Sequence, residues 1–267
     1  MLNQVGRYVS TYSFARCLLM AGILLAFQYS AFGVVLPGIG VPRGGLTRYT
    51  VPSGAFALPQ AANPNPGILP PNSHPHGATY GEWAARWWQW ALSIPADKSP
   101  FADPTGDHCG EGQAGSVWYL VPLAGPVQAV GHCEMPAGKS IFMPVWWVLF
   151  GAVAGDCEPS NPGVPCDVSA LQAAAASLVE SATTLDVLID GVRVQDIVGY
   201  RAKSPGGFSI KLPENPVLSL PPGTYSPQVA DGYWLMLTPL TPGKHDIEVH
   251  VIAAGFDGKM LTHVKVN

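Results

Sequence analysis

Charged residues are scarce in this sequence. Of 267 residues, 14 are lysine or arginine and 18 are aspartate or glutamate, so 12% are charged, about half the usual share. No run of basic residues occurs, which excludes nucleic acid as a partner, because phosphate binding needs clustered lysine and arginine. The 48% hydrophobic content excludes highly charged disorder for most of the chain, and the 30 glycines and 27 prolines exclude a coiled coil or a long helical bundle.

The common catalytic sequence motifs are also absent. The chain has no G-x-S-x-G nucleophile elbow, no G-x-x-x-x-G-K-[ST] phosphate loop and no G-x-G-x-x-G dinucleotide loop. These absences exclude hydrolases, nucleoside triphosphatases and dehydrogenases of the common kinds. The sequence predicts no cofactor, and it leaves open whether the protein is an enzyme.

The first residues have the pattern of a secretory signal peptide. Two arginines precede an apolar run, residues 17–27, and no acidic residue occurs before Glu82. We predict a signal peptide over residues 1–33, and hence a secreted or periplasmic protein. The alternative is an uncleaved anchor facing outside, because residues 17–36 carry no charge and are just long enough to span a bilayer. Membrane contact is expected only through this segment.

Four cysteines remain after the predicted cleavage, and an exported chain with an even number of cysteines favours disulfides. Four cysteines allow three pairings. We predict Cys109–Cys133 and Cys157–Cys166, because each pair closes a short segment rich in glycine and proline. A zinc site is the alternative, but the chain has no Cys-x₂-Cys pair, and we predict no metal.

The remaining chain divides into a linker and one folded domain. Residues 34–78 hold nine prolines and seven glycines, which predicts an extended linker. Residues 79–267 form the predicted domain. A capping-box pattern, Thr79 with Glu82, predicts a helix near 79–94 whose tryptophans recur at helical spacing. A second helix is predicted near 168–182, with Asp167 or Ser169 as N-cap.

Short apolar runs separated by proline and glycine turns predict strands in the rest of the domain. The runs are residues 116–123, 140–150, 185–189, 192–197, 207–212, 232–237, 244–252 and 260–266. Asp190-Gly191 predicts a tight hairpin between two of them. In the run 244–252 apolar and polar residues alternate, which predicts one buried and one solvent-facing side. The expected fold is a β-sandwich, immunoglobulin- or jelly-roll-like, with two accessory helices.

Several strings resemble a group of uncharacterised exported bacterial proteins. They are Tyr80-Gly81-Glu82-Trp83, Trp87-Trp88-Gln89-Trp90-Ala91-Leu92-Ser93-Ile94-Pro95, Asp103-Pro104-Thr105-Gly106 followed by Cys109, Gly112-Gln113 with Val117-Trp118, Pro136-Ala137-Gly138-Lys139, and Tyr225-Ser226-Pro227 with Asp231-Gly232-Tyr233. The resemblance covers roughly residues 79–250. It implies export and a single folded unit, and no activity comes with it.

The binding candidates lie on the first helix and on two tryptophan-containing strands. They are Trp83, Arg86, Gln89, Trp118 and Trp147. Flat indole faces suit the apolar faces of sugars, although helical spacing favours a core role for the helix tryptophans. Trp146 and Trp147 are expected to point to opposite faces of one strand. Glu82, Arg86 and Gln89 form a polar stripe that is either solvated or part of a cleft.

The catalytic candidates are carboxylates and one histidine. They are Glu82, Asp103, Asp107, His108 and Glu111. Two carboxyl groups flanking a sugar perform glycoside hydrolysis, but acidic residues in glycine-rich loops more often cap turns. A metal site at His74-Pro75-His76 with Glu82 is disfavoured, because Pro75 lies in a proline-rich segment.

These observations lead to three interpretations. The first is an exported, disulfide-stabilised β-sandwich protein that binds a glycan or an envelope protein. The second is a secreted hydrolase or lyase that acts on a polysaccharide or ester through the acidic residues of the 82–111 region. The third is a structural surface protein without a small-molecule site. Exposed tryptophans in a row support glycan binding, and two carboxylates in one pocket support catalysis.

Overall fold

The computed structural model describes residues 63–65, 67–103, 105–122, 129–157 and 166–267. These residues form a mainly β fold with two open sheets and two α-helices, which confirms the predicted fold class. The predicted signal peptide and its alternative as an anchor lie outside the described residues. Over the described ranges, no helix is both long and apolar enough to cross a membrane.

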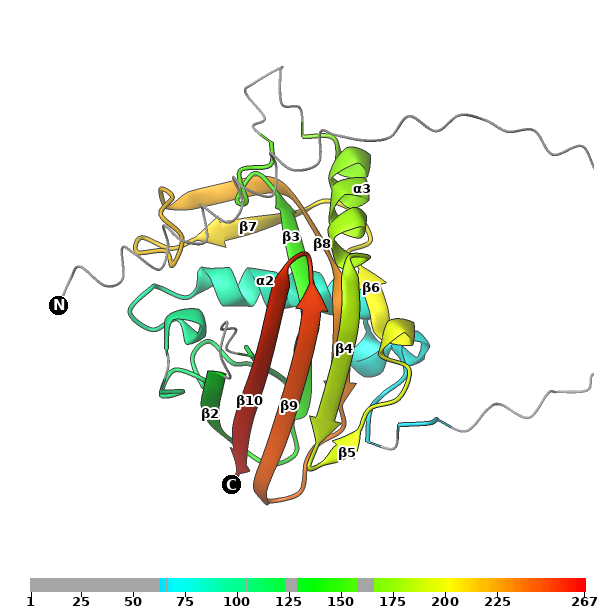
Figure 1. Cartoon of the computed structure of the whole chain (residues 1–267). Coiled ribbons are helices and arrows are strands. Elements are labelled where there is room, and N and C mark those ends of the chain that lie inside the picture. The colour runs from blue at the N-terminus through cyan, green and yellow to red at the C-terminus, as the bar shows by residue number, and fades with distance from the viewer. Residues whose placement is uncertain (1–62, 66, 104, 123–128, 158–165) are drawn as a thin grey trace, which may run out of the picture. The chain divides into compact units, whose positions relative to one another are not determined.

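Each sheet contains five strands. Figure 1 shows β4, β9 and β10 of one sheet lying side by side. The first sheet has the order β1 (Val117–Tyr119), β3 (Ser140–Gly151), β8 (Gly223–Leu237) and β6 (Arg201–Lys203), with β7 (Phe208–Leu212) also paired to β8. The second sheet has the order β2 (Ala129–Met135), β10 (Phe256–Val266), β9 (Gly243–Ala253), β4 (Ala182–Ile189) and β5 (Val192–Arg193). Two pairings are parallel, β1 with β3 and β2 with β10. The strand orders also show that the chain passes back and forth between the two sheets, because β2 of the second sheet lies between β1 and β3 of the first in the sequence.

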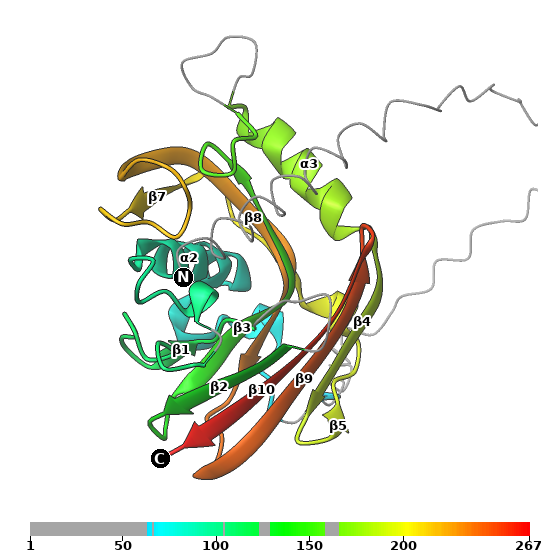
Figure 2. The ribbon, with the colours of Figure 1, turned by 60° about the vertical axis from the view of Figure 1, so that its left-hand side comes forward.

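The first sheet is covered on both faces (Figure 2). Helix α2 (Tyr80–Ser93) packs on one face, while the second sheet and helix α3 (Val168–Val179) cover the other. Trp147 of β3 faces α2, with its ring 6.0 Å from that of Trp87, and Trp146 stacks on Phe256 of the second sheet at 6.1 Å. The expected opposite orientation of these two neighbours is therefore confirmed.

The second sheet has one buried and one solvent-facing side. On β9, Ile247, Val249 and Val251 are buried, while Asp246 and Glu248 are exposed. The predicted alternation in this strand is confirmed. The core of the domain consequently lies between the sheets and between the first sheet and α2, and the outer face of the second sheet is polar.

Both predicted disulfides are present. Cys109 is bonded to Cys133 with the two Cα atoms 5.4 Å apart, and Cys157 is bonded to Cys166 with the Cα atoms 5.1 Å apart. The first disulfide attaches the glycine-rich loop before β1 to the edge strand β2. Such bonds persist in oxidising compartments, so they indicate an extracytoplasmic environment.

The predicted helix boundaries hold at three of four ends. Thr79 caps α2 with the full capping box, and Asp167 caps α3 by accepting a hydrogen bond from the amide of Ala170. The predicted end of α3 at residue 182 is wrong. The helix ends at Val179, because Ala182 already pairs with β9 as the first residue of β4.

Among the strands, the Asp190-Gly191 hairpin forms as expected, with φ values of 50° and 76°. Strand β8 begins nine residues before the predicted run at 232–237. Its earlier part contains Pro227 and polar residues, which conceal the strand in the sequence. Strands β2 and β6 were not predicted, because β2 lacks apolar alternation and β6 has three residues, two of them basic.

The predicted linker extends too far toward the C-terminus. Residues 63–65 and 67–78 pack on the domain rather than leading up to it. The buried amide of Asn65 donates to the carbonyl oxygen of Gln195 at 2.8 Å and accepts from its backbone N–H at 2.7 Å. The backbone N–H of Leu69 donates to the carbonyl oxygen of Met236 at 2.8 Å. This segment is therefore part of the folded unit.

Candidate functional site

The tryptophans of α2 belong to the core. Trp83, Trp87 and Trp90 are 8%, 0% and 8% exposed. Their indole N–H groups donate to the carbonyl oxygens of Pro75, Leu120 and Glu111 at 2.9–3.0 Å. Helix α2 thus fixes three surrounding loops through its indoles, as well as filling space against the first sheet.

No row of exposed tryptophans exists. Trp118 is buried, Trp147 is half-buried, and all eight tryptophans of the chain are either buried or half-buried. The hypothesis that Trp83, Trp118 and Trp147 offer stacking faces for a sugar therefore finds no support in their positions. Trp83 and Trp118 serve packing instead.

The polar stripe of α2 lines a surface hollow. Glu82, Ala85, Arg86 and Gln89 form one wall, and the loop from Ser204 to Phe208, which joins β6 to β7, forms the other. The volume of the hollow is about 210 Å³. Gln89 crosses to the far wall, where its amide donates to the carbonyl oxygen of Ser209 at 2.9 Å. The structure thus brings together Arg86 and Gln89 of the predicted binding set, with Glu82 of the catalytic set.

Arg86 is exposed, contacts an aromatic ring and forms an ion pair with no carboxylate of the described residues. Its guanidinium carbon lies 4.6 Å from the centre of the Trp83 ring, a cation–π contact. Among the three arginines that the structure describes, Arg193 pairs with Asp186 and Arg201 with Asp231, whereas Arg86 has no carboxylate within ion-pair distance. Burial raises the pKa of the nearby Tyr119 hydroxyl to about 12, and the Arg86 charge opposes this shift.

Glu82 is committed to capping the helix. Its carboxylate accepts hydrogen bonds from the backbone N–H of Thr79 at 2.7 Å and from the Thr79 hydroxyl at 2.9 Å. These two bonds hold the pKa of Glu82 below its usual value. A catalytic acid needs a raised pKa, so the environment of Glu82 is the wrong one for that role.

The remaining catalytic candidates lie in a separate loop. Asp103 is 5% exposed and accepts from the backbone N–H of Thr105 at 2.8 Å and of His108 at 2.7 Å. Burial acts to raise the pKa of Asp103, but these hydrogen bonds and one from the Thr105 hydroxyl outweigh it, so the pKa is lowered. Asp103 therefore stabilises its own turn.

The two groups of carboxylates do not share a cavity. Asp103 lines a small cavity of about 20 Å³, next to Trp90 and the Cys109–Cys133 disulfide, whereas Glu82 lines the hollow of α2. Asp107 and Glu111 belong to the same loop as Asp103, and Glu111 contributes its carbonyl oxygen to Trp90. The cavity beside Asp103 holds about one water molecule, so it offers no room for a sugar.

The histidines before α2 are not arranged to bind a metal. Both ring nitrogens of His76 contact hydroxyl groups, Nε2 that of Ser140 at 3.0 Å and Nδ1 that of Ser116 at 3.1 Å. Throughout the residues that the structure describes, no three or more His, Cys, Asp or Glu side chains form a group that could hold a metal ion.

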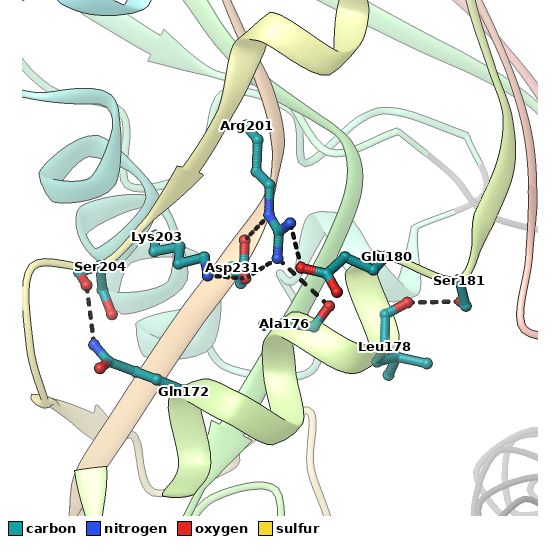
Figure 3. A network of polar contacts seen from close by, with 9 residues as sticks. All are labelled: Gln172, Ala176, Leu178, Glu180, Ser181, Arg201, Lys203, Ser204 and Asp231. Carbon is teal, nitrogen blue, oxygen red and sulfur yellow. Dashed lines mark hydrogen bonds and ion pairs between the residues drawn. The ribbon is translucent and has the colours of Figure 1, made fainter. Parts of the chain in front are cut away.

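A charged network at the end of α3 is structural (Figure 3). Asp231 of β8, 1% exposed, accepts from Arg201 of β6 at 3.0 Å and 2.8 Å, and Lys203 lies 3.7 Å from it. Arg201 also donates to Glu180 at 2.8 Å and to the carbonyl oxygen of Ala176. The bond to Asp231 raises the pKa of Arg201 above its ordinary value. The network joins α3 to the first sheet, and sequence spacing gives no signal for it.

Comparison with known proteins does not assign this site. No family model, curated protein or solved structure matches the chain. The arrangement of the hollow is therefore the basis for the proposal that follows.

Proposed function

We propose that the protein is an exported, disulfide-stabilised binding protein that acts outside the cytoplasm or at the cell envelope. Its partner is a protein that places an acidic side chain in the hollow between α2 and the Ser204–Phe208 loop. The two disulfides within one β-rich domain support the location. The unpaired guanidinium of Arg86 supports the ligand chemistry.

Arg86 carries this proposal. A guanidinium offers two parallel N–H groups that match the two oxygens of a carboxylate. Contact with the Trp83 ring restricts the Arg86 side chain, which lowers the entropy lost when a ligand binds. The neighbouring Glu82 carboxylate is occupied by Thr79, so it does not neutralise Arg86 by direct pairing.

The size of the hollow favours a macromolecule over a free small molecule. Pockets that enclose a small ligand have volumes of about 300–1,000 Å³. A hollow of about 210 Å³ is smaller, and it suits one side chain of a larger partner. The half-buried and buried tryptophans favour a protein partner over a neutral glycan, which needs exposed stacking faces.

Replacement of Arg86 by alanine is expected to weaken binding of an acidic peptide at least tenfold. The probe is acetyl-Glu-Glu-amide, with acetyl-Gln-Gln-amide as its neutral counterpart. Loss of a charge-assisted hydrogen bond costs about 1.5–3 kcal/mol, which is more than a tenfold change in Kd. NMR titration of the purified chain measures the Kd and shows whether the amides of Gly206, Gly207 and Phe208 respond.

Two further variants make this experiment specific. Arg86→Lys keeps the charge but loses the planar fork, so it is expected to restore only part of the affinity. Lys211→Ala removes an exposed charge from β7 outside the hollow, and is expected to leave the Kd unchanged. Equal binding of the neutral peptide, or full binding by the Arg86→Ala protein, contradicts the proposal. If the chain binds an oligogalacturonide but not the peptide, the proposal of a protein partner is wrong and the ligand is an acidic glycan.

The other two interpretations have less support from the geometry. The hydrolase interpretation needs two carboxylates across one cavity, and Glu82 and Asp103 line different ones. The interpretation as a structural surface protein needs no ligand site. It gains support if neither peptide nor oligogalacturonide binds at millimolar concentration and the purified chain self-associates.

A further inference from the structure

Two histidines lie side by side on the outer face of the second sheet. Strands β2 and β10 are parallel neighbours (Figure 1). Their register places His132 directly opposite His263. The centres of the two imidazole rings are 5.1 Å apart and the rings are tilted by 32°. His132 is exposed, and the side chain of His263 is 41% exposed, so solvent reaches both rings.

A carboxylate orients one of these rings. Asp246 of β9 lies opposite His263 in the antiparallel register, and its Oδ1 is 2.7 Å from Nδ1 of His263. An ionised carboxylate only accepts hydrogen bonds, so Nδ1 carries the hydrogen and the lone pair of the neutral ring is on Nε2. The arrangement of carboxylate, imidazole and free Nε2 is the one that orients histidine ligands in metal sites.

Charged side chains of both signs lie two register positions from the histidines. Lys265 pairs there with Glu134 at 3.0 Å, and Lys244 of β9 stands opposite Lys265. The Glu134 carboxylate offsets the Lys265 charge, and the Asp246 carboxylate lies against His263 itself. The sheet holds the backbones of both histidines in a fixed pairing, so little backbone entropy is lost when both rings bind one ion.

We infer that His132 and His263 bind a divalent transition-metal ion, Zn²⁺ or Cu²⁺, with Asp246 positioning His263 and water completing the coordination. Imidazole nitrogen is a preferred ligand of both ions, whereas calcium and magnesium prefer oxygen. The site is independent of the hollow at α2. It has two protein ligands, which is consistent with the absence of larger ligand groups in the described part of the chain.

The same sheet face contains a matched control. His250 of β9 also contacts a carboxylate, but through the other ring nitrogen, with Nε2 2.9 Å from Oδ1 of Asp257. Its cross-strand neighbours are Lys259 and Asp186, so a second imidazole does not stand opposite it. A single imidazole beside a lysine is expected to bind a metal ion poorly.

Isothermal titration calorimetry of the purified, oxidised chain with Zn²⁺ alone tests this inference. We expect one equivalent to bind, and His132→Asn or His263→Asn to lower the affinity at least tenfold. Asp246→Asn is expected to lower it about tenfold, the usual effect of losing the partner of a histidine ligand. His250→Asn is expected to leave it unchanged.

Spectroscopy locates the ion independently of affinity. Zn²⁺ is expected to shift the ring nitrogen resonances of His132 and His263 together, and Cu²⁺ to give an electron paramagnetic resonance spectrum with two nitrogen ligands. Unchanged affinity in the His263→Asn protein, or shifts confined to other histidines, overturns the inference. The four variants replace side chains on the solvent-facing side of the sheet. Circular dichroism is therefore expected to show the same fold in each variant as in the parent protein.

Discussion

Replacement of Gly81 by alanine is expected to destabilise the folded protein by about 3 kcal/mol. A Cβ atom at Gly81 would lie 1.9 Å from the carbonyl oxygen of Lys203 and 2.9 Å from its carbonyl carbon. Both atoms belong to the backbone of β6, which is paired with β8 and cannot move aside alone. Trp83 and Trp87 hold α2 against the same sheet by packing on Phe142 and Trp234, so the clash strains the whole contact between helix and sheet.

The sign of this effect distinguishes the clash from helix propensity. Where no clash occurs, replacing a glycine inside a helix by alanine stabilises the helix by about 1 kcal/mol. Urea unfolding of the oxidised chain measures the change. Gly206→Ala is the matched control, because a Cβ atom there meets nothing within 4 Å, and its free energy of unfolding is expected to change by less than about 1 kcal/mol. A Gly81→Ala protein as stable as the parent would show that α2 can separate from β6 without cost.

Removal of the Asp231 carboxylate is expected to cost about 3 kcal/mol of stability. Breaking a buried ion pair leaves the other charge without its partner, which typically costs about 3–5 kcal/mol. The Asp231 side chain is 2% exposed, but that of Arg201 is 21% exposed, so the lower end of this range applies. Urea unfolding of the Asp231→Ala protein at pH 7 measures the loss.

Two variants of the same network test the reason for this loss. Glu180 bonds the same guanidinium, but its side chain is 61% exposed, so Glu180→Gln is expected to cost less than about 1 kcal/mol. Replacing both partners with apolar residues, Asp231→Leu with Arg201→Met, is expected to recover most of the loss, because no unpaired charge remains. A double variant as unstable as Asp231→Ala argues against an unpaired charge as the cause.

The sequence predicted those features that depend on neighbouring residues. The capping box at Thr79 and Glu82, the Asp190-Gly191 hairpin and the alternation in β9 are local patterns, and all three are present. The disulfide pairing was also predicted correctly, because short loops favour pairing of cysteines that are close in the sequence.

Features that depend on distant residues could not be predicted. Asn65 attaches the segment before α2 to Gln195, which is 130 residues away, and a proline-rich sequence alone resembles a free linker. The register of β2 with β10, which places His132 beside His263, follows from a parallel pairing with no local signal. The separation of Glu82 from Asp103 into two cavities likewise depends on how the loop of Asp103 packs against β2.

The place of β10 in the second sheet has a consequence for how fast the protein folds. Strand β10 follows both β2 and β9 in the sequence, yet it lies between them in the sheet. Without residues 256–266, β2 has no partner strand in that sheet and β9 pairs on one side only. The sheet is therefore completed by a parallel pairing between Ala129 and Met260 and the residues that follow each of them, which are far apart in the sequence. Pairings between distant segments form slowly, so completion of the second sheet is expected to be a slow step in folding.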